Sequence, residues 1–531
     1  MTQEPPESYS PATPVPSSMS GVARGTAANL MGAAAMAAAN LAVTFMVARR
    51  LDPDDAGVFF SSTSLFLLAT ALGMLGTNTG LVYFIARARA LGRPSAIFSY
   101  FRAGLRPVLV VGCSMAVTLF VFAPQLAVMI NSDYSEDTTT YLRILAFFIP
   151  LAGLENATLA ASRGLGSMRA NVLVEQFGRS LLQAVFVGIA VVAATQTPWL
   201  LGVGWALPYL PAAVVAALWW RRQSRRASSR RSADDPPGST ASSAADGKPQ
   251  QSTAREFWTF TGPRALGSVA QLVIQRLDVI LVFSMAGPAQ AAVYFAATRF
   301  LVVGQMGNRA ISLAVQPRLA TTLARGERAA TNHFYQSSTA WLMVLTWPLY
   351  ITLIIFAAPL LALFKEEYRT GALAVVILCS SMLIATLCGM VDMVLNMAGR
   401  TSWSLANVMV ALGLNVGIDL WLIPTQGFLG AAIGWAVAIV AQNALALTQT
   451  GFILGLHPFG KGSLVAAIVN LVCFAATGAL CRLILGSTLY SVLVTIVLGG
   501  ALYSLALWRL RRTLQLDTLF SLRRAKKAAP R

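Results

Sequence analysis

Two stretches, LDPDDAGVFFSST at residues 51–63 and AGPAQAAVYFAAT at residues 286–298, share a pattern of proline, small residues, an aromatic pair and threonine. They lie 235 positions apart, and each connects two long apolar runs. The matching positions at this offset are Pro53/Pro288, Ala56/Ala291, Val58/Val293, Phe59/Tyr294, Phe60/Phe295 and Thr63/Thr298. An internal repeat of this kind predicts a chain built from two similar halves.

Around these two copies, apolar runs recur from residue 21 to residue 509. The chain has 531 residues, of which 56% are hydrophobic and only 11% charged, too apolar a composition for one soluble domain. A helix of about 20 apolar residues crosses the hydrocarbon of a bilayer. We therefore predict an all-α polytopic membrane protein with about fourteen transmembrane helices. The expected spans are 21–48, 57–86, 104–130, 140–163, 170–195, 199–220, 257–286, 289–317, 337–364, 371–398, 403–424, 428–455, 463–484 and 487–508.

Six spans make up each repeat, and because six is an even number, both copies keep the same orientation in the membrane. The sequence thus predicts two parallel six-helix lobes followed by two additional helices. The expected segments are a disordered tail (1–20), an N-lobe (21–220), a linker (221–255), a C-lobe (256–456), two C-terminal helices (457–509) and a basic tail (510–531).

The net charge of +19 follows the positive-inside rule and does not indicate a nucleic-acid partner. With a cytoplasmic N-terminus, the inward loops include the arginine-rich residues 221–231, and the outward loops include the acidic residues 52–55 and 366–367. We expect both termini in the cytoplasm. Residues 1–20 have no basic n-region and are not expected to be a cleaved signal peptide.

The linker, residues 221–255, is rich in arginine and then in serine, alanine, glycine and proline. Its repeated Arg-Arg-x-Ser pattern at Ser224 and Ser228 is one that a Ser/Thr kinase could recognise. The alternative is a positively charged membrane anchor and tether without modification.

The residues that usually mark metal sites or enzymes are few. All five cysteines fall in apolar spans, so we expect small core residues and no disulfides. His333 and His457 lack ligand-spaced partners, so no metal site is expected. The chain contains no GxxxxGK[ST], HExxH or GxSxG motif. We predict a transporter and not an enzyme, with no cofactor apart from coupling to H+, Na+ or the membrane potential.

Polar residues inside a bilayer are costly and usually face a cavity or a partner. In the run VIQRLDVILVF, residues 273–283, Gln275 and Asp278 share a helix face with Gln271 one turn earlier. Arg276 lies about 200° around the helix from Asp278, so the two charges cannot pair within this helix.

The next span carries Arg299 and Arg309 on one face, with Met306, Ser312 and Gln316 along the same stripe. The two arginines stand ~15 Å apart along the axis. They suit a phosphate-bearing ligand, since arginine binds phosphate through two hydrogen bonds. Alternatively they pair with acids of neighbouring helices or extend toward the interface.

Other spans carry isolated polar groups. The first helix has Arg24 near its inner end and Asn40 further along, and the fifth has Glu175 and Arg179 at the spacing of an intrahelical ion pair. Three further intramembrane acids are candidates for ion coupling, as is Asp278, or for pairing with arginines such as Arg163: Glu155, Asp392 and Asp419.

Three segments together resemble the multidrug/oligosaccharidyl-lipid/polysaccharide (MOP) exporter superfamily, and within it the polysaccharide or O-antigen type (Wzx-like) flippases. They are ARRLDPDDAGVFF (48–60), QRLDVILVFSMAGPAQAAVYFAATR (275–299) and GRTSWSLANVMVALGLNVGIDLWLIPTQGFLGAAIGW (399–435). The similarity extends over about residues 20–510.

This resemblance implies that the protein moves a polyprenyl-diphosphate-linked oligosaccharide or related glycolipid across the bacterial cytoplasmic (inner) membrane by alternating access, for cell-envelope polysaccharide synthesis. The expected partners are membrane lipid, the lipid-linked glycan, and glycosyltransferases or a polymerase of the same pathway. In this interpretation a cationic cavity neutralises the diphosphate through Arg24, Arg276, Arg299 and Arg309, while Asn40, Gln271, Gln275 and Asp278 contact sugar or tune the arginines.

Three alternatives remain. A cation-coupled multidrug antiporter of the same superfamily often has an acid in its first helix, where this chain has Asn29 and Asn40. A lipid II flippase usually has more basic residues there than Arg24 alone. The third is a non-transporting scaffold for cell-wall synthesis.

Overall fold

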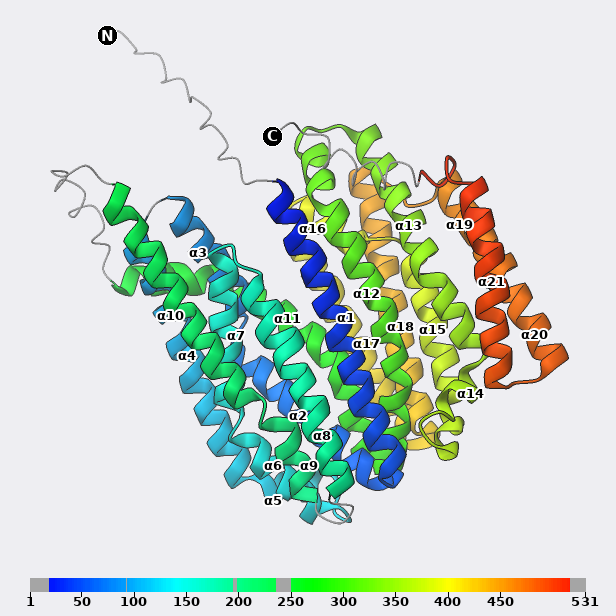
Figure 1. Ribbon diagram of the computed structural model, residues 1–531, viewed down its shortest axis with the longest axis horizontal. Coiled ribbons are helices and arrows are strands. Elements are labelled where there is room, and N and C mark those ends of the chain that lie inside the picture. Colours follow the sequence, from blue (N-terminus) through cyan, green and yellow to red (C-terminus); the bar gives the residue numbers. More distant parts are fainter. Residues whose placement is uncertain (1–18, 92, 194–197, 235–249, 516–531) are drawn as a thin grey trace, which may run out of the picture.

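The computed structural model describes residues 19–91, 93–193, 198–234 and 250–515, and this part of the chain consists of helices without a strand (Figure 1). Of the predicted tails, residues 19–20 and 510–515 are described, and the others lie outside the described residues. The helices before the linker are α1 (Met19–Arg50), α2 (Pro53–Met74), α3 (Thr77–Ala90), α4 (Pro94–Val121), α5 (Ala123–Ile130), α6 (Ser135–Ala146), α7 (Ile149–Gly164), the π-helix η1 (Asn171–Arg179), α8 (Ser180–Ala193), α9 (Pro198–Ala206) and α10 (Tyr209–Asp234).

The second part of the chain is helical in the same way. Its helices are α11 (Gln250–Ala286), α12 (Pro288–Ala324), α13 (Arg328–Ile355), α14 (Ala357–Leu361), the 3-10 helix η3 (Glu366–Gly371), α15 (Ala372–Leu387), α16 (Val391–Met397), α17 (Thr401–Gln426), α18 (Phe428–Gln449), the π-helix η4 (Thr450–Leu454), α19 (Lys461–Asn470), the π-helix η5 (Leu471–Ala476), α20 (Thr477–Leu485) and α21 (Leu489–Arg509).

These helices confirm the predicted all-α polytopic membrane fold. Within the described residues, twelve helical segments are long and apolar enough to cross a bilayer, or thirteen when the bent pair Ser135–Ala146 and Ile149–Gly164 counts as one span. Each of them overlaps an expected span. The remaining expected span, 289–317, lies within α12, which packs along α2 and α13. The count of fourteen is therefore approximate, while the class of fold is established.

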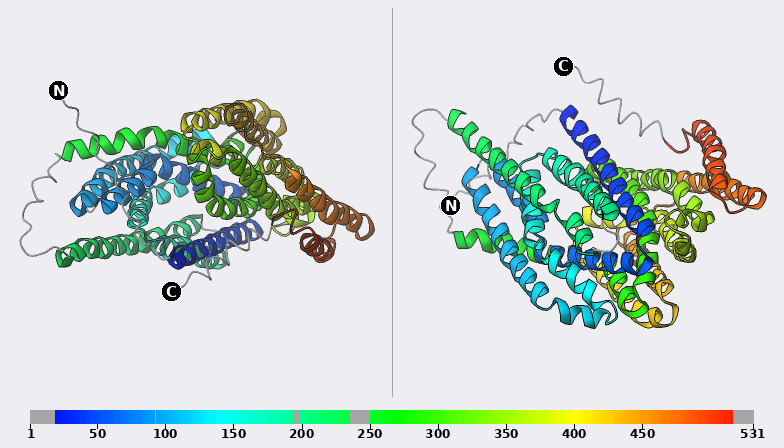
Figure 2. Two further views of the ribbon diagram at one scale, coloured as in Figure 1. Left: turned by 90° about the horizontal axis from the view of Figure 1, so that it is seen from above. Right: turned by 60° about the horizontal axis from the view of Figure 1, so that its bottom comes forward.

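The helices form two groups, which we call the first helix group (α1–α10) and the second helix group (α11–α18) (Figures 1 and 2). Helices α19–α21 lie at the far edge of the second group, against α13. Helix α1 begins and α10 ends at the same end of the molecule in Figure 1, which we call the basic end. The opposite end, where α1 turns into α2, is the acidic end. The boundaries predicted for two lobes stay a prediction.

Much of the predicted linker is helical. Helix α10 continues to Asp234 and α11 begins at Gln250, so only residues 235–249 of residues 221–255 lie outside the described chain. Arginine and alanine have high helix propensity, which explains why α10 extends beyond its apolar part. The first turns of α11 lie on the first helix group, where Glu256 bonds Arg87 at 3.1 Å and Tyr100 at 2.9 Å.

The two helix groups pack closely at the acidic end. The ring of Phe60 on α2 stacks on Phe295 of α12 with centroids 4.1 Å apart. Beside this pair, Gly57 approaches the Pro288 carbonyl so closely that a Cβ atom would overlap it. The paired aromatic positions of the sequence repeat thus meet in this contact, and Pro288 of the second copy packs against Gly57 of the first.

Polar contacts reinforce the acidic end. The Asp54 carboxylate accepts a hydrogen bond from the Ala289 N–H at 3.1 Å, and Lys365 lies 3.2 Å from Asp52. Partial burial lowers the pKa of Lys365, but its hydrogen bonds to Asp52 and Glu367 outweigh that effect and raise the pKa above the usual lysine value.

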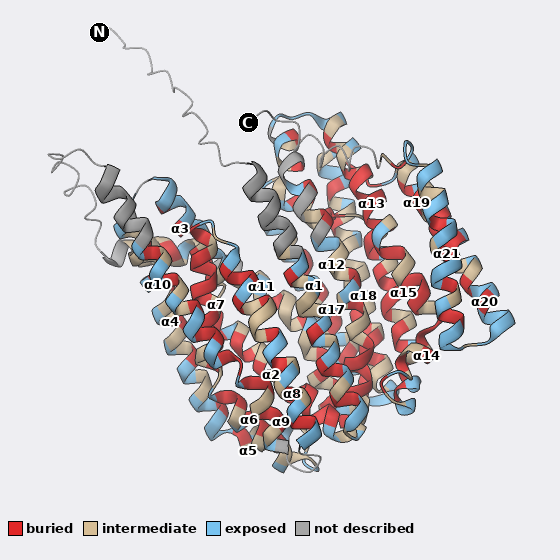
Figure 3. Ribbon diagram, viewed as in Figure 1, coloured by how far each residue is buried: buried red, intermediate tan, exposed pale blue. Residues whose placement is uncertain are grey.

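Burial along α12 decreases toward the basic end. Residues 291–297 are all buried, whereas Asn308, Arg309 and Gln316 are exposed (Figure 3). Because polar side chains are unfavourable against lipid, this exposed polar face indicates a water-accessible space. The described helices therefore pack tightly at the acidic end and separate toward the basic end.

The outer surface is apolar, as expected for a lipid-facing protein. Val117 of α4 and Leu483 of α20 are exposed over 63% and 84% of their surface. Four of the five cysteines are buried and none is in a disulfide, in agreement with the sequence analysis. Cys113 is the exception, because it is exposed on α4 and is not a core residue.

The close approach of α2 to α12 is testable with Gly57→Ala. The added Cβ overpacks the contact with Pro288, and overpacking costs about 1–3 kcal/mol. We expect a lower thermal unfolding midpoint for the purified protein in detergent. Gly417→Ala is the matched control, because Gly417 is exposed on a helix with open space around it. Equal midpoints for the two variants would show that the α2–α12 contact is looser than the structure indicates.

Candidate functional site

A buried cluster of polar side chains lies inside the second helix group. The Tyr294 hydroxyl of α12 donates to Asp278 of α11 at 2.7 Å. On α17, the Asn415 amide donates to Asp419 at 3.1 Å. The Asp278 and Asp419 carboxyl groups are also within hydrogen-bonding reach of each other. Three helices thus contribute to one site, which we call the carboxylate cluster (Asp278, Tyr294, Asn415 and Asp419).

The carboxylate cluster has spare acceptor atoms. One oxygen each of Asp278, Asn415 and Asp419 is buried without a hydrogen-bond partner. Gly434 of α18 lies directly against Asp419, so a side chain there would fill this space. Two adjacent carboxylates repel each other when both are ionised, and a shared proton or a small cation relieves that repulsion. The cluster is therefore able to bind H+ or a hard monovalent cation through oxygen atoms.

Arg276 lies on the other side of α11, as the helical geometry predicts. It makes none of the ion pairs formed by the described residues, and its Nε atom is buried without a hydrogen-bond partner. It lies near Tyr209 of α10, which belongs to the first helix group. Arg276 is thus a cation between the two groups with no carboxylate to neutralise it.

Arg299 of α12 lies near Arg276, so that the two positive charges repel each other. Its guanidinium lies 4.0 Å from the centroid of the Phe295 ring, the same ring that stacks on Phe60. Its hydrogen bonds are long, at 3.4 Å to the Phe295 carbonyl and 3.3 Å to the Thr298 hydroxyl. Like Arg276, it has no carboxylate partner among the described residues. We call Arg276 and Arg299 the arginine pair.

The other residues predicted for a cationic cavity are more dispersed. Arg309 is exposed toward the basic end of α12, and the Arg24 side chain lies outside the described residues. Asn40 is exposed and donates to the Met36 carbonyl of its own helix at 2.9 Å. Gln275 is exposed and Gln271 half-buried. Among the described side chains, the structure therefore places Arg299 near Arg276 and leaves Asn40, Gln275 and Arg309 exposed.

Two predicted acids have separate partners. Glu155 is buried and bonds Arg179 at 3.1 Å, and Arg179 also lies 3.8 Å from Glu175 and over the ring of Tyr209. Asp392 accepts from Gln442 at 3.1 Å and keeps one oxygen without a partner. Neither acid pairs with Arg163, which donates to Asn171 at 2.6 Å.

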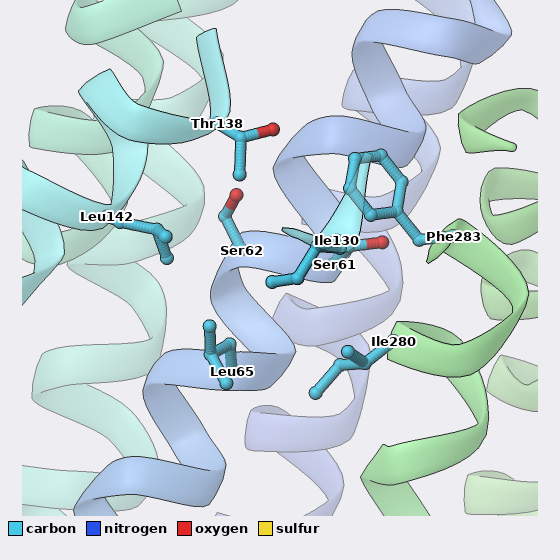
Figure 4. A pocket seen from close by; sticks show the side chains of 8 residues that line it. All are labelled: Ser61, Ser62, Leu65, Ile130, Thr138, Leu142, Ile280 and Phe283. Atoms are coloured by element: carbon cyan, nitrogen blue, oxygen red, sulfur yellow. The ribbon is translucent and has the colours of Figure 1, made fainter. Parts of the chain in front are cut away.

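A small internal cavity near the acidic end is distinct from these sites. It encloses about 10 Å³ between α2, α6 and α11, and Ser62 and Thr138 point toward one another across it (Figure 4). The hydroxyls of Ser61, Ser62 and Thr138 are buried without protein partners. The volume and the polar lining suit one water molecule and exclude a sugar or a lipid headgroup.

Several partners in these clusters were not identified from the sequence: Tyr209, Tyr294 and Asn415. The repeat contained an indication of the role of Tyr294. Tyr294 aligns with Phe59 and Asp278 aligns with Val43, so two apolar positions of the first copy are polar in the second. Both polar substitutions occur only in the second copy, and the structure joins them by a hydrogen bond. Nothing in the sequence pattern indicated that Glu155 and Arg179, from different helices, would pair.

The Glu155–Arg179 pair can be tested by removing one or both charges. Arg179→Met leaves the Glu155 carboxylate buried without its cation, which costs about 3–5 kcal/mol. We expect a large drop in the thermal unfolding midpoint, and substantial recovery when Glu155→Leu is added. If the double variant also retains transport, Glu155 acts in stability and not in ion coupling. A double variant as unstable as Arg179→Met would contradict a mutual pair.

Comparisons with solved structures agree on the fold. The lipid II flippase MurJ in an inward closed conformation matches with a TM-score of 0.68 and 12% identity, covering 93% of this chain and 99% of that chain. An inward-facing multidrug resistance MATE family transporter of the MOP superfamily matches with a TM-score of 0.60 and 15% identity, covering 82% of this chain and 95% of that chain. A MOP superfamily transporter from Pyrococcus furiosus matches with a TM-score of 0.53 and 15% identity, covering 85% of this chain and 95% of that chain. At these identities the likeness shows the fold alone.

Sequence comparison identifies the family. No curated protein matches. The family model described as polysaccharide biosynthesis protein matches residues 22–323, more than half of the chain, and the MatE model matches residues 263–421. Both family models describe transporters or flippases and not enzymes. The chain is therefore a member of the polysaccharide biosynthesis protein family within the MOP exporter superfamily, as the sequence motifs predicted.

Proposed function

We propose that this protein is a flippase that moves a polyprenyl-diphosphate-linked oligosaccharide or a related glycolipid across the cytoplasmic membrane by alternating access. The family membership supports a flippase or exporter, and the name of the family supports a glycan substrate. Similarity to a lipid II flippase fits the same chemistry, because the cargo of that relative is also a lipid. In this proposal the basic end and both termini face the cytoplasm, as the positive-inside rule favours.

The observation that carries the proposal is the arginine pair. Two neighbouring cations without a carboxylate partner are unfavourable at membrane depth unless water or an anion reaches them. A diphosphate supplies two adjacent anionic groups, each able to accept two hydrogen bonds from a guanidinium. The pair lies just beyond the closed contact of Phe60 and Phe295, on the side where α12 becomes exposed. A headgroup entering from the basic end would therefore reach Arg309 first and then the arginine pair.

The carboxylate cluster supplies a coupling site for this movement. Asp278 and Arg276 are two residues apart on α11 and face opposite directions, one toward Asp419 and the other toward the first helix group. Binding of H+ or Na+ at Asp278 and Asp419 changes the charge repulsion between α11 and α17. A resulting shift of α11 would move Arg276 relative to Tyr209, which links ion binding to the substrate site.

A second candidate function is cation-coupled antiport of a drug. The MatE match over residues 263–421 includes the whole carboxylate cluster, which favours it. The arginine pair disfavours it, because a cationic drug would be repelled there.

Substitution of the arginine pair separates these functions. We expect Arg299→Ala and Arg276→Ala, at equal expression, to lower glycolipid translocation at least about tenfold, the loss of one charge-assisted phosphate contact. Arg299→Lys should retain part of the activity, since it keeps the charge but not the paired geometry. Translocation is measured in a depletion strain as the fraction of polyprenyl-linked glycan that reaches the outer leaflet.

Arg106→Ala is the control, because Arg106 is exposed on α4 and makes no ion pair among the described residues. Full translocation by Arg299→Ala and Arg276→Ala would assign the pair a structural role. A depletion strain in which the glycan crosses at a normal rate would overturn the flippase itself.

The coupling site is tested with Asp278→Asn, which keeps the size of the side chain but removes its charge. In proteoliposomes, we expect the dependence of transport on an imposed H+ or Na+ gradient to disappear. Asp392→Asn is the comparison, since Asp392 is a partly satisfied acid in a different place. Loss of gradient dependence in Asp392→Asn alone would move the coupling role from the carboxylate cluster to Asp392.

A further inference from the structure

A pocket of about 500 Å³ opens on the outer side of the first helix group, at its basic end. One wall is the turn between α7 and η1, with Ser167 and Arg169, and the other is the last part of α10, with Trp219, Arg222 and Gln223. Helix α10 lies along the lower edge of the molecule in the left view of Figure 2. The pocket is therefore reached from the surroundings of the protein and not from between the two helix groups.

The polar part of the pocket is cationic and incompletely satisfied. Arg169 and Arg222 are both exposed, and neither takes part in an ion pair of the described residues. The Oε1 atom of Gln223 is buried without a hydrogen-bond partner. The two guanidinium groups and the Ser167 hydroxyl are donors that suit the oxygens of a phosphate, whereas the Gln223 Oε1 atom is an acceptor and does not contribute to that binding.

The remaining wall of the pocket is apolar. Val215 and Leu218 line it and are 45% and 47% exposed, although both are hydrophobic. Leu218 and Arg222 are four residues apart, so they lie one above the other on the same face of α10. Trp219 packs against the apolar cluster of α7, η1 and α10 and also lines the pocket. This face changes from aliphatic to aromatic to cationic within two helical turns.

That order of side chains matches the depth profile of a lipid leaflet. Residues 199–225 form a candidate membrane span, and Arg222 lies at its basic end, at the level of the headgroups. Tryptophan prefers this interfacial level, and basic pockets between helices at the interface bind anionic headgroups.

The pocket is separate from the proposed substrate site. Tyr209 of α10 faces Arg179 and Arg276. Leu218 and Arg222 lie about 140° to 180° around the same helix from Tyr209. A ligand in the pocket thus contacts the surface of α10 that is turned away from the arginine pair.

We propose that this pocket binds an anionic phospholipid of the leaflet at the basic end, with its phosphate between Arg169 and Arg222 and an acyl chain along Leu218 and Val215. The lipid joins the end of α7 to the end of α10 and so holds the basic end of the first helix group at a fixed depth in the membrane. Phosphatidylglycerol has this chemistry, whereas phosphatidylcholine has a cationic group that opposes the two arginines.

The test uses the full-length protein in nanodiscs of phosphatidylcholine titrated with phosphatidylglycerol, and counts retained lipid by native mass spectrometry. We expect Arg169→Ala with Arg222→Ala to weaken phosphatidylglycerol retention about tenfold or more. Leu218→Asn should weaken it as well, because the acyl contact is lost. Arg102→Ala with Arg106→Ala is the matched control, since both arginines are exposed on α4. Its retention should equal that of the unchanged protein.

Three outcomes would overturn the proposal. One is unchanged phosphatidylglycerol retention in the Arg169/Arg222 double variant, with unfolding midpoints in phosphatidylcholine confirming that it folds. A second is displacement by inorganic phosphate together with insensitivity to Leu218→Asn, which would indicate a site for a free anion. A third is preferential binding of an added polyprenyl diphosphate over phosphatidylglycerol, which would make the pocket an entry site for the transported lipid.

Discussion

The cost of an unpaired charge in hydrocarbon determines how the interior of this protein is organised. A buried carboxylate needs a cation, a proton or several donors, and a buried guanidinium needs acceptors or water. Glu155 pairs with Arg179 through one oxygen and keeps the other without a partner, and the carboxylate cluster is partly satisfied by the Tyr294 hydroxyl and the Asn415 amide. Against that background Arg276 and Arg299 stand out, because no carboxylate neutralises them. Because they lack a carboxylate partner, these two arginines are the candidates for binding an anionic substrate.

The two copies of the sequence repeat share a pattern of apolar and small residues but differ in polarity. The repeat brings Phe60 against Phe295 and Gly57 against Pro288, so equivalent turns form the contact that closes the acidic end. At the matching positions of the repeat, the second half alone carries Asp278, Tyr294 and Arg299. In the proposed alternating-access cycle, two similar halves would rock against each other, and these charges would lie on one side of the moving contact. Helix α11 connects the two sets, since it carries Asp278 on one face and Arg276 on another.

Fold and site differed in how far the sequence could predict them. Apolar runs long enough to span a bilayer have few alternatives to a helix, so the spans and the family were predicted well. The opposite faces of Arg276 and Asp278 followed from the helical period, and the structure places their contacts accordingly. Partners on other helices did not follow, because a helical period fixes the direction of a side chain on its own helix only. Glu155 with Arg179, and Asp278 with Asp419, are pairings of this kind.

The sequence by itself determined an all-helical membrane protein with two related halves, a basic and an acidic end, and polar residues at defined positions of its spans. Length, apolarity and periodicity are properties of a single segment. A long apolar segment in a bilayer forms a helix, because only a helix satisfies its backbone hydrogen bonds within the segment. Only the tertiary structure decided which charges are neutralised, where the helix groups touch and which arginines stay without a partner. These depend on the approach of helices that are up to hundreds of residues apart in the chain, where packing at Gly57 and stacking at Phe60 set the distances.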